Sequence, residues 1–412
     1  MKVLVLSCST GQGHDSCARA IKEHGERCGD VCEIDDAIRF VSPLLSRFMS
    51  WGHATMYKHL PWLFRFGYRF SERHPELFWR KSGIYRLFAL GTGALHRRIE
   101  AGGFDAVVCT HAFAAVMLTN VLRKHRPHVA TCLVNTDYTC NPCTKDSELD
   151  RYFIPDRSLA DDFECESIGK ERVHSVGIPL RSEFYHHVST DEAKAALGIP
   201  AHRRHLVMMC GSMGCGPMAR LARHLANEAP PDVDISIVCG TNRRLEKRLA
   251  KRYAANPRVH VRGFVRDMSL LMDSVDLCLT KPGGISITEA AVKRVPLILI
   301  DAVAGCEEAN LDFFVRKGGA KGGSDVKELA RLATNLLSRP AEMQAMREGL
   351  ASFSKVDSPN LIRSHLVELL EVKARKNSTL SLAMTSEDVS AVWTPRSRVA
   401  STGAHGCREI GL

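Results

Sequence analysis

Short apolar runs alternate along this chain with longer segments that mix apolar and charged residues. The runs are rich in valine, leucine and isoleucine, which is typical of strands buried on both faces of a parallel sheet. This alternation predicts an α/β protein in which helices cover the sheets. In the first part of the chain we expect strands at Lys2–Ser7, at a run ending in Asp36, and at Asp105–Thr110, Val129–Asn135, Tyr152–Pro155 and Val173–Val176.

The same alternation starts again after Gly177–Arg181, where glycine and proline end the first series. Two Rossmann-like domains are therefore expected, residues 1–180 and 181–374, with only helices after Ile300. Residues 375–412 are rich in serine, threonine and glycine and show no period, so we expect a disordered tail there. The strands predicted for the second domain are His205–Cys210, Ile235–Cys239, Val259–Val261, Leu277–Thr280 and Pro296–Ile300.

The loop after the first strand, Ser9-Thr10-Gly11-Gln12-Gly13-His14, precedes a predicted helix over Ser16–Arg27. Its Gly-x-Gly, with acidic residues about twenty positions later, is typical of a dinucleotide-binding turn, although Ser16 occupies the third glycine position. A histidine at the carboxyl end of a strand in an α/β sheet is placed to act as a catalytic base. His14 fits that role and equally fits a residue that caps the helix. Asp137, at the end of a later strand, is likewise a candidate for the cleft or a turn cap.

A strand, a Pro-Gly-Gly turn and a helix follow one another over Leu277–Ala291. The two glycines let a ligand approach the backbone closely, and the free N–H groups at the start of a helix favour an anion. The stretch therefore predicts half of a nucleotide site, with phosphate near Gly283, Gly284 and Ser286. Glu289 lies in the first turns of the helix and would hold the ribose hydroxyls. An ordinary strand–helix turn with a solvated glutamate fits about as well.

The segment Phe40–Phe88 departs from the strand–helix alternation, because aromatic and basic residues are interleaved there and acidic residues are sparse. This composition is typical of amphipathic helices that lie on an anionic membrane surface, with their rings at the level of the headgroups. A helical insertion that buries its aromatic residues is the second interpretation, and a surface for single-stranded nucleic acid is a distant third. The residues expected to meet the membrane or a lipid are Trp51, Tyr57, Trp62, Arg65 and Tyr68.

Composition and charge narrow the class of protein. The 412 residues are 45% hydrophobic and 25% charged, as in globular proteins, and carry a formal net charge of +10. This positive excess suits an anionic partner such as nucleic acid, acidic lipid or a phosphorylated substrate. The 15 cysteines are scattered, many of them in apolar runs, which fits a reducing cytosol better than a disulfide framework. No run of about 20 apolar residues is present, so no membrane-spanning helix is expected.

Several motifs occur in a fixed order over residues 1–372, and the ordered set is far more specific than any single glycine loop. They are Ser9–His14, Thr136-Asp137-Tyr138, Gly177–Arg181, Gly211-Ser212-Met213-Gly214, Gly263-Phe264-Val265, Thr280–Gly284 with Glu289, and the Gly-x-Glu-Glu turn at Gly305. With these motifs the chain resembles family 28 glycosyltransferases of the monogalactosyldiacylglycerol synthase and processive diacylglycerol glucosyltransferase type. It is more distantly similar to the GlcNAc transferase that makes the peptidoglycan lipid precursor.

The resemblance implies the GT-B architecture, in which two Rossmann-like domains face each other across a cleft and a C-terminal helix returns to the first domain. It places a lipid acceptor on the first domain and a UDP-sugar on the second, with no tightly bound cofactor. In this arrangement Glu289 meets the ribose, and Phe264 and Val265 border the uracil. Arg181 pairs with the diphosphate. The full set of donor residues that the resemblance implies is Arg181, Gly211, Ser212, Met213, Gly214, Gly240, Phe264, Val265, Lys281, Gly283, Gly284, Ser286, Glu289, Glu307 and Glu308.

The implied reaction is attack by the 3-hydroxyl of diacylglycerol on the anomeric carbon of the sugar, with inversion and loss of UDP. His14 would take the hydroxyl proton, and Asp137 is the alternative base or the group that orients it. No cluster of metal ligands is apparent in the sequence, so no essential metal is expected. The expected partners are the UDP-sugar, the lipid and an anionic membrane surface, without nucleic acid. The expected location is cytoplasmic, peripheral on the inner face of the cell membrane.

Two positions depart from the family pattern. Cys306 stands where the family commonly has a glutamine, whose amide hydrogen-bonds sugar hydroxyls better than a thiol does. Thr139–Lys145 stands where many members carry an aromatic or histidine-rich stretch. The sugar stays open between galactose, glucose and GlcNAc, and the acceptor between diacylglycerol, a polyprenyl-linked lipid and a sterol. A non-catalytic nucleotide-sugar sensor and an NAD-dependent oxidoreductase are the alternatives from other classes.

Overall fold

The structure of the protein is a computed structural model, which describes residues 1–8, 12–77, 82–141, 143–302 and 305–390. Within these ranges it describes all side chains except those of residues 53–54, 57–59, 61, 64–65, 68, 72, 75 and 376–390. The chain divides into two compact units, Met1–Val367 and Glu368–Leu412. The first unit contains both β-sheets of the fold.

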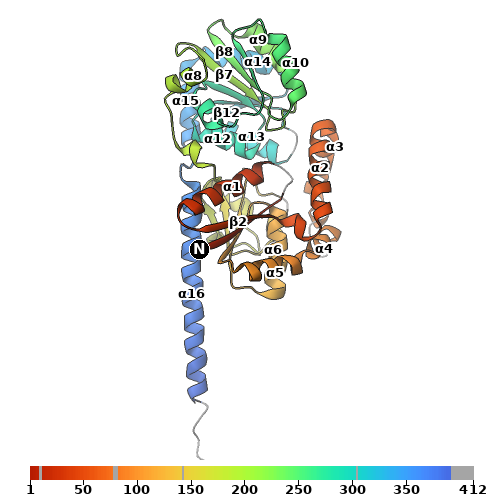
Figure 1. Cartoon of the computed structure of the whole chain (residues 1–412), viewed down its shortest axis with the longest axis vertical. Helices are drawn as coiled ribbons and strands as arrows, with labels where there is room; N and C mark the ends of the chain where they lie inside the picture. The colour runs from red at the N-terminus through yellow and green to blue at the C-terminus, as the bar shows by residue number, and fades with distance from the viewer. Residues whose placement is uncertain (9–11, 78–81, 142, 303–304, 391–412) are drawn as a thin grey trace, which may run out of the picture. The chain divides into compact units, whose positions relative to one another are not determined.

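Six parallel strands form the first sheet in the order β2-β1-β3-β4-β5-β6. Figure 1 labels its edge strand β2. Five of the six residues of β1 are buried, which is expected for a strand that helices cover on both faces. The strands are β1 (Lys2–Ser7), β2 (Val31–Asp36), β3 (Ala106–Cys109), β4 (Ala130–Val134), β5 (Arg151–Ile154) and β6 (Val173–Ser175). The helices between them, apart from the insertion treated below, are α1 (Gln12–Arg27), α5 (Thr92–Gly102), α6 (Ala112–His125) and α7 (Ala160–Phe163).

The second sheet also has six parallel strands, in the order β12-β11-β10-β7-β8-β9. The boundary predicted at residues 180–181 falls between β6 and β7. The strands are β7 (Arg204–Met209), β8 (Val233–Val238), β9 (Val259–Arg262), β10 (Leu277–Thr280), β11 (Leu297–Ile300) and β12 (Ala320–Gly323). The helices are α8 (Thr190–Ala196), α9 (Met218–Glu228), α10 (Arg243–Tyr253), α11 (Met268–Asp273), α12 (Gly284–Val292), α13 (Cys306–Arg316), α14 (Val326–Leu337) and α15 (Pro340–Ala351).

The expectation of helices alone after Ile300 was wrong, because β12 follows α13 and pairs with β11. Its sequence is Ala-Lys-Gly-Gly, which has no β-branched or aromatic residue and therefore no strand propensity. Pairing with β11 at the edge of the sheet, and not local sequence, makes this segment a strand.

The insertion between β2 and β3 is helical, as predicted, and consists of α2 (Pro43–His59), α3 (Pro61–Arg73) and α4 (Gly83–Ala89) before α5. Ser42 caps α2 by accepting a hydrogen bond from the Leu45 N–H, and Pro43 supplies a first helical position with no N–H to satisfy. Leu60 separates α2 from α3, and a second proline starts α3.

Helix α16 (Ser358–Ser390) begins against the first sheet. The Arg363 Nε donates to Asp30 Oδ2 at 2.7 Å, and the Arg151 Nη1 donates to the His365 carbonyl at 3.0 Å. These contacts confirm that the C-terminal helix returns to the first domain. Residues 375–390, for which the sequence predicted disorder, continue the helix, and no glycine or proline interrupts the chain there. Residues 391–412 of the predicted tail lie outside the described residues.

A shared hydrophobic core joins the two halves of the first unit. Tyr138, which follows β4, packs its ring 4.6 Å from that of Phe313 and 4.9 Å from that of Phe314, measured between ring centroids. Its hydroxyl lies 2.9 Å from the Thr288 hydroxyl of α12, and burial raises the pKa of Tyr138 above its usual range. The carboxyl end of β4 is thereby held against the start of α12.

Candidate active site

The two sheets meet where β4 and β10 end. The Asn310 side chain of α13 bridges them, because its Oδ1 accepts from the Tyr138 N–H at 2.6 Å and its Nδ2 donates to Asp137 Oδ1 and to the Pro282 carbonyl, each at 2.9 Å. Gly284 lies so close to this junction that a Cβ there would stand 1.9 Å from the Thr136 carbonyl oxygen. Asp137 is therefore part of a cross-domain contact at the carboxyl edge of the first sheet.

His14 lies in the first turn of α1 and is half-buried. Its Nδ1 stands 2.7 Å from the Thr110 carbonyl oxygen and 3.0 Å from the Thr136 hydroxyl. A carbonyl oxygen only accepts, so Nδ1 must carry the proton in this contact, and the neutral ring then keeps its lone pair on Nε2. These contacts are with strand ends and not with the N–H groups of α1, so His14 does not cap its own helix.

A cavity of about 450 Å³ lies beside His14 and Asp137. Most of its lining is apolar, and it takes residues from α2, from the ends of β3 and β4, and from the start of α13, where Cys306 lies. The apolar residues that line the cavity include Phe48, Met49, Met56, Phe113, Leu133 and Val134. The sequence predicted the aromatic character of α2 but not that these residues line a cavity.

His111 is a second histidine that the sequence analysis did not assign to the site. It follows β3, lines the same cavity, and its ring centroid lies 4.5 Å from that of His14. The polar Thr110-His111 pair at the end of a buried strand is the sequence signal from which His111 could have been identified.

Glu289 is half-buried in α12, and none of the described hydrogen bonds involves its carboxyl group. Burial raises the pKa of Glu289 to about 8, against the opposing effect of the positive charge of Arg181. Arg181 itself forms an ion pair with Glu183 at 2.7 Å. Glu289 and Arg181 are therefore close enough for the charge of Arg181 to affect the carboxyl group of Glu289.

The predicted glycines of the second domain have a packing role in the structure. A Cβ on Gly214 would stand 2.1 Å from the Cys239 carbonyl oxygen, and one on Gly240 would stand 2.2 Å from the Ser212 carbonyl oxygen. Both glycines also have positive φ, so a larger residue would be disfavoured by the clash and by the backbone conformation. Gly211 and Met213 belong to the same loop after β7, between Met209 and α9.

Further predicted donor residues lie in the stretch from Lys281 to Ser286 and after β9. Lys281 is buried, and its Nζ lies 3.2 Å from Asp301 Oδ2, so its charge is already balanced. Gly283 and Ser286 lie at the start of α12, where free N–H groups face outward from the helix end. Phe264 is exposed after β9, and its neighbour Val265 is half-buried; no described contact joins Phe264 to Glu289.

Glu307 and Glu308 lie in the first turn of α13. Glu308 Oε1 accepts from Arg69 Nη2 of α3 at 3.0 Å, a contact that the sequence did not predict because the two residues are far apart along the chain. Both side chains are partly exposed, so the pair contributes little to stability, but it connects the helical insertion with the start of α13.

The insertion exposes large apolar side chains. Trp51 and Trp62 are 65% and 67% exposed, whereas Tyr85 and Phe88 near the end of the insertion are buried, so the alternative of a buried aromatic core holds for that end alone. Leu44, Phe48 and Phe66 are exposed to a similar degree. The side chains of Tyr57, Arg65 and Tyr68, and the residues Ser9, Thr10 and Gly11 of the first glycine loop, lie outside the described part of the structure. None of the described helices is both long enough and apolar enough to cross a membrane.

Two Rossmann-like sheets, joined at the carboxyl ends of their strands beside a histidine and a helix N-terminus, define the GT-B class of proteins. The family model Monogalactosyldiacylglycerol (MGDG) synthase matches residues 14–180, and the model Glycosyltransferase family 28 C-terminal domain matches residues 205–355. The chain belongs to glycosyltransferase family 28 and is a glycosyltransferase. This confirms the family resemblance, and the sensor and oxidoreductase alternatives are wrong.

Curated relatives cover most of the chain. Monogalactosyldiacylglycerol synthase of Spinacia oleracea is 27% identical over 399 residues, which cover 90% of this chain and 73% of the relative. Processive diacylglycerol beta-glucosyltransferase of Bacillus licheniformis is 23% identical over 381 residues, which cover 92% of this chain and 97% of the relative.

Solved structures show the same fold. The crystal structure of Acinetobacter baumannii MurG has a TM-score of 0.59 at 13% identity and covers 90% of this chain and 99% of its own. UDP-GlcNAc 2-epimerase of Neisseria meningitidis, bound to UDP-GlcNAc, has a TM-score of 0.58 at 14% identity and covers 89% of this chain and 100% of its own. At these identities the likeness concerns the fold alone.

Proposed function

We propose that this enzyme transfers galactose or glucose from a UDP-sugar to the 3-hydroxyl of diacylglycerol, with inversion at the anomeric carbon. The observation that carries the proposal is His14, whose Nδ1 faces the Thr110 carbonyl beside an apolar cavity of about 450 Å³. An apolar cavity next to a basic nitrogen suits a hydroxyl carried on a lipid. The names of the curated relatives, which are diacylglycerol glycosyltransferases, support the same acceptor.

In the proposed reaction, His14 Nε2 takes the proton of the acceptor hydroxyl as its oxygen attacks the anomeric carbon. The bond between that carbon and the diphosphate breaks, and UDP leaves with the electron pair. Asp137, held by Asn310 at 2.9 Å, orients the acceptor or serves as the alternative base. The start of α12 and Arg181 stabilise the negative charge that develops on UDP.

For the donor, we propose that Glu289 holds the ribose, while Gly283, Gly284 and Ser286 face the phosphates. Phe264 and Val265 border the uracil. A UDP-sugar bound to an epimerase of the same fold supports a nucleotide-sugar donor. The loop Gly211–Gly214 with Gly240 shapes the sugar pocket, Lys281 supports it through Asp301, and Glu307 and Glu308 contact the sugar or the ribose. Residues 1–180 then form the acceptor domain and residues 181–374 the donor domain.

We further propose that α2 and α3 bind an anionic membrane from its cytoplasmic side, so that the enzyme is peripheral on the inner face of the cell membrane. Phe48 supports this placement, because it is exposed on α2 and also lines the cavity beside His14. A lipid that enters along this face reaches the cavity without crossing water.

A donor screen tests the proposal. Purified protein is mixed with anionic liposomes that contain diacylglycerol, a polyprenyl-linked lipid or a sterol, each with UDP-galactose, UDP-glucose or UDP-GlcNAc, and lipid products are identified by mass. A hexosyl diacylglycerol is expected. Transfer only to a polyprenyl-linked lipid or a sterol would contradict diacylglycerol as the acceptor. A product from UDP-GlcNAc alone would contradict galactose or glucose as the transferred sugar.

Replacing Glu289 with glutamine is expected to stabilise the free enzyme at pH 8 by roughly 2 kcal/mol and to weaken UDP binding by about tenfold. The pKa of this carboxyl is raised from 4.5 to about 8, so the native state holds its proton more tightly than the unfolded chain does. Its contribution to stability is full below pH 4.5 and is lost as the pH rises towards 8. Because glutamine does not ionise, the variant does not lose this stability as the pH rises.

Urea unfolding at pH 4 and pH 8, with UDP titration calorimetry, measures both effects. Replacing Glu166, an exposed glutamate outside the helices and strands, with glutamine is the matched control and should change neither quantity. An equal gain at both pH values would show that ionisation is not the cause, and unchanged UDP affinity would remove Glu289 from the proposed donor site.

Replacing Trp51 and Trp62 together with alanine is expected to weaken binding to anionic liposomes by about tenfold or more, without lowering the unfolding midpoint. Both rings are exposed in the free protein, so their loss removes membrane contact and little packing. Liposome sedimentation measures the binding. Val356→Ala, an exposed apolar position outside the insertion, is the control. Unchanged sedimentation of the double variant would contradict the proposed membrane face.

A further inference from the structure

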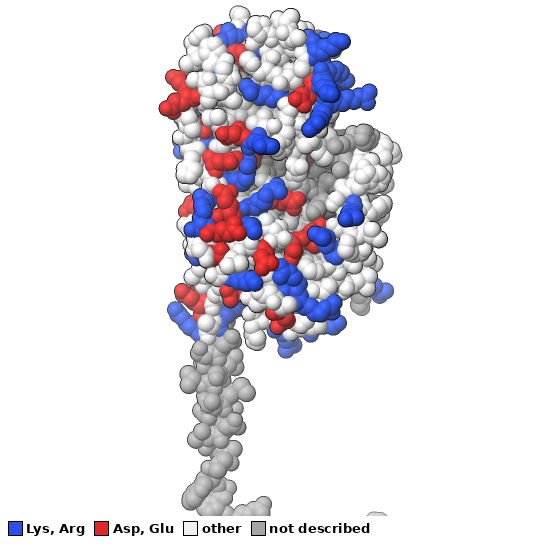
Figure 2. Space-filling model, viewed as in Figure 1, with Lys and Arg blue, Asp and Glu red and all other residues white. Residues whose placement is uncertain are grey.

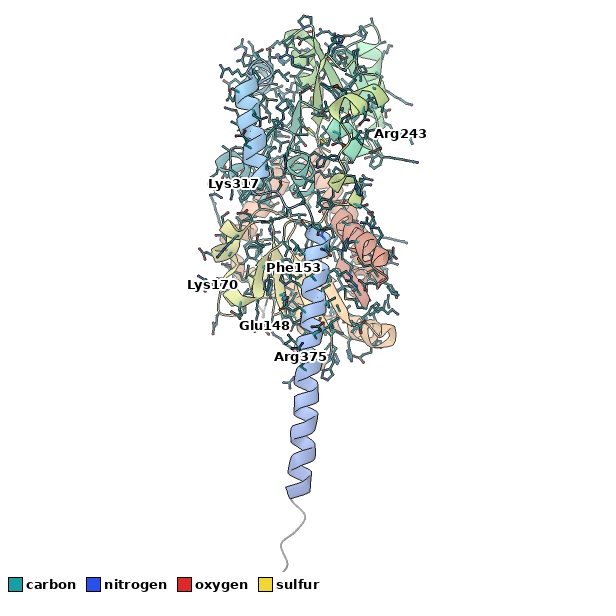
Figure 3. All side chains as sticks on the ribbon, turned by 90° about the vertical axis from the view of Figure 1, so that its left-hand side faces the viewer. Glu148, Phe153, Lys170, Arg243, Lys317 and Arg375 are labelled. Carbon is teal, nitrogen blue, oxygen red and sulfur yellow. The ribbon has the colours of Figure 1, made fainter. Side chains whose placement is uncertain are left out.

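A second cavity, of about 900 Å³, lies in the second domain and differs chemically from the cavity beside His14. Its walls are the loop Met213–Pro217 after β7, the starts of α9 and α10, and residues that follow β11 and β12. Four arginines line it, one from α9 and three from α10: Arg220, Arg243, Arg244 and Arg248. Figure 2 shows lysine and arginine side chains gathered where Figure 1 draws α10, and Figure 3 labels Arg243 at the first residue of that helix.

These four arginines have no acidic partner among the described ion pairs. Other arginines of the same domain do: Arg204, for example, pairs with Asp232 at 2.8 Å. The carboxylate that lines the cavity, Asp301, lies 3.2 Å from the buried Lys281 Nζ, so it offers the arginines little compensation. Four like charges around one hollow repel one another, and a bound polyanion would relieve this repulsion.

The wall between the loop and α10 is held by specific contacts. Asn242 Nδ2 donates to the Gly214 carbonyl at 3.1 Å, and its Oδ1 accepts from the Leu245 N–H at 3.1 Å. The Thr241 N–H donates to the Ser212 carbonyl at 2.8 Å. The Asn242 contacts fix the start of α10, and with it the backbone of its three arginines, against the glycine loop.

We infer that this cavity binds a phosphate-bearing ligand, with a phosphomonoester or diphosphate group that carries at least two negative charges. Guanidinium groups match phosphate oxygens in paired hydrogen bonds, and several of them favour a dianion over a carboxylate. The inference does not rest on the proposed function, because the lining omits Arg181, Glu289 and the start of α12. Only Met213 and Gly214 are shared with the proposed donor site, so a bound ligand would contact the loop expected to shape the sugar pocket.

Titration calorimetry of the full chain with inorganic pyrophosphate, carried out both without UDP and with saturating UDP, tests the inference. Saturable binding is expected, and the double variant Arg243→Gln with Arg248→Gln should weaken it by about tenfold or more. Lys247→Gln with Lys251→Gln removes the same charge from the same helix at positions outside the cavity lining and should leave the affinity within about twofold. Circular dichroism melts confirm that both variants fold.

Three results would overturn the inference: no pyrophosphate binding, competition in which UDP displaces pyrophosphate, or equal loss in both double variants. Absence of binding would show that the cavity takes no phosphate ligand. Displacement by UDP would show that pyrophosphate binds in the donor site. Equal loss in both double variants would show that binding depends on the overall charge of α10 and not on the arginines that line the cavity. A parallel sedimentation with phosphatidylcholine vesicles, with and without phosphatidic acid, identifies the source of the phosphate. Arginine-dependent binding to phosphatidic acid vesicles indicates a lipid headgroup, and pyrophosphate binding alone indicates a soluble ligand.

Discussion

Replacing His14 with glutamine is expected to slow sugar transfer about a thousandfold while leaving UDP affinity unchanged. The glutamine amide can still donate a hydrogen bond towards the Thr110 carbonyl, which His14 Nδ1 contacts at 2.7 Å. It has no basic nitrogen in the position of Nε2, so the acceptor hydroxyl loses its proton acceptor. Transfer rates with diacylglycerol liposomes, together with UDP calorimetry, separate loss of chemistry from loss of donor binding.

The control for this experiment is His24→Gln, the same substitution about three turns further along α1. It should retain the transfer rate within a few-fold. If His14→Gln also retained the rate, Nε2 would not be the base, and Asp137→Asn would then be the decisive variant. If His14→Gln abolished UDP binding as well, the proposed separation of acceptor and donor sites would be wrong.

The position of His14 was predictable from the sequence, but its chemical state was not. A histidine after a buried strand and a glycine loop is placed at the carboxyl edge of the sheet by the rules of the α/β fold. The identity of the proton-carrying nitrogen depends on Thr110 and Thr136, which follow other strands and lie 96 and 122 residues away. The parallel register of the sheet brings these residues together, and no local pattern encodes that register.

Other features could not be predicted from the sequence for the same reason, because they depend on contacts between distant parts of the chain. Strand β1 was predicted with the bounds that the structure shows, because a buried parallel strand is largely apolar along its length. Strand β12 was missed because pairing, and not propensity, forms it. The pairing of Arg69 with Glu308 and the contribution of Cys306 to the cavity beside His14 both depend on where the insertion and α13 lie in space. Local sequence therefore predicted strands with buried, apolar sequences better than it predicted which distant residues meet.

Replacing Gly284 with alanine is expected to lower the free energy of unfolding by about 2 kcal/mol and to slow transfer at least tenfold. The new Cβ would stand 1.9 Å from the Thr136 carbonyl oxygen and 3.0 Å from Asp137 Oδ1. The first distance is far inside van der Waals contact with a backbone atom, so the ends of β4 and the start of α12 must move apart. Thr136 also contacts His14 Nδ1 at 3.0 Å, so the displacement reaches the proposed base.

Gly283→Ala is the matched control, because a Cβ on Gly283 would meet nothing within 4 Å and the residue has an ordinary φ of −74°. Its free energy of unfolding should stay within about 1 kcal/mol of the wild type. The comparison uses urea unfolding, since Gly283 is itself proposed to face the phosphates and its activity is not a neutral reference. Equal stability of the two variants would mean that the contact between Gly284 and Thr136 relaxes freely. In that case the junction would not be what holds His14, Asp137 and the start of α12 in one site.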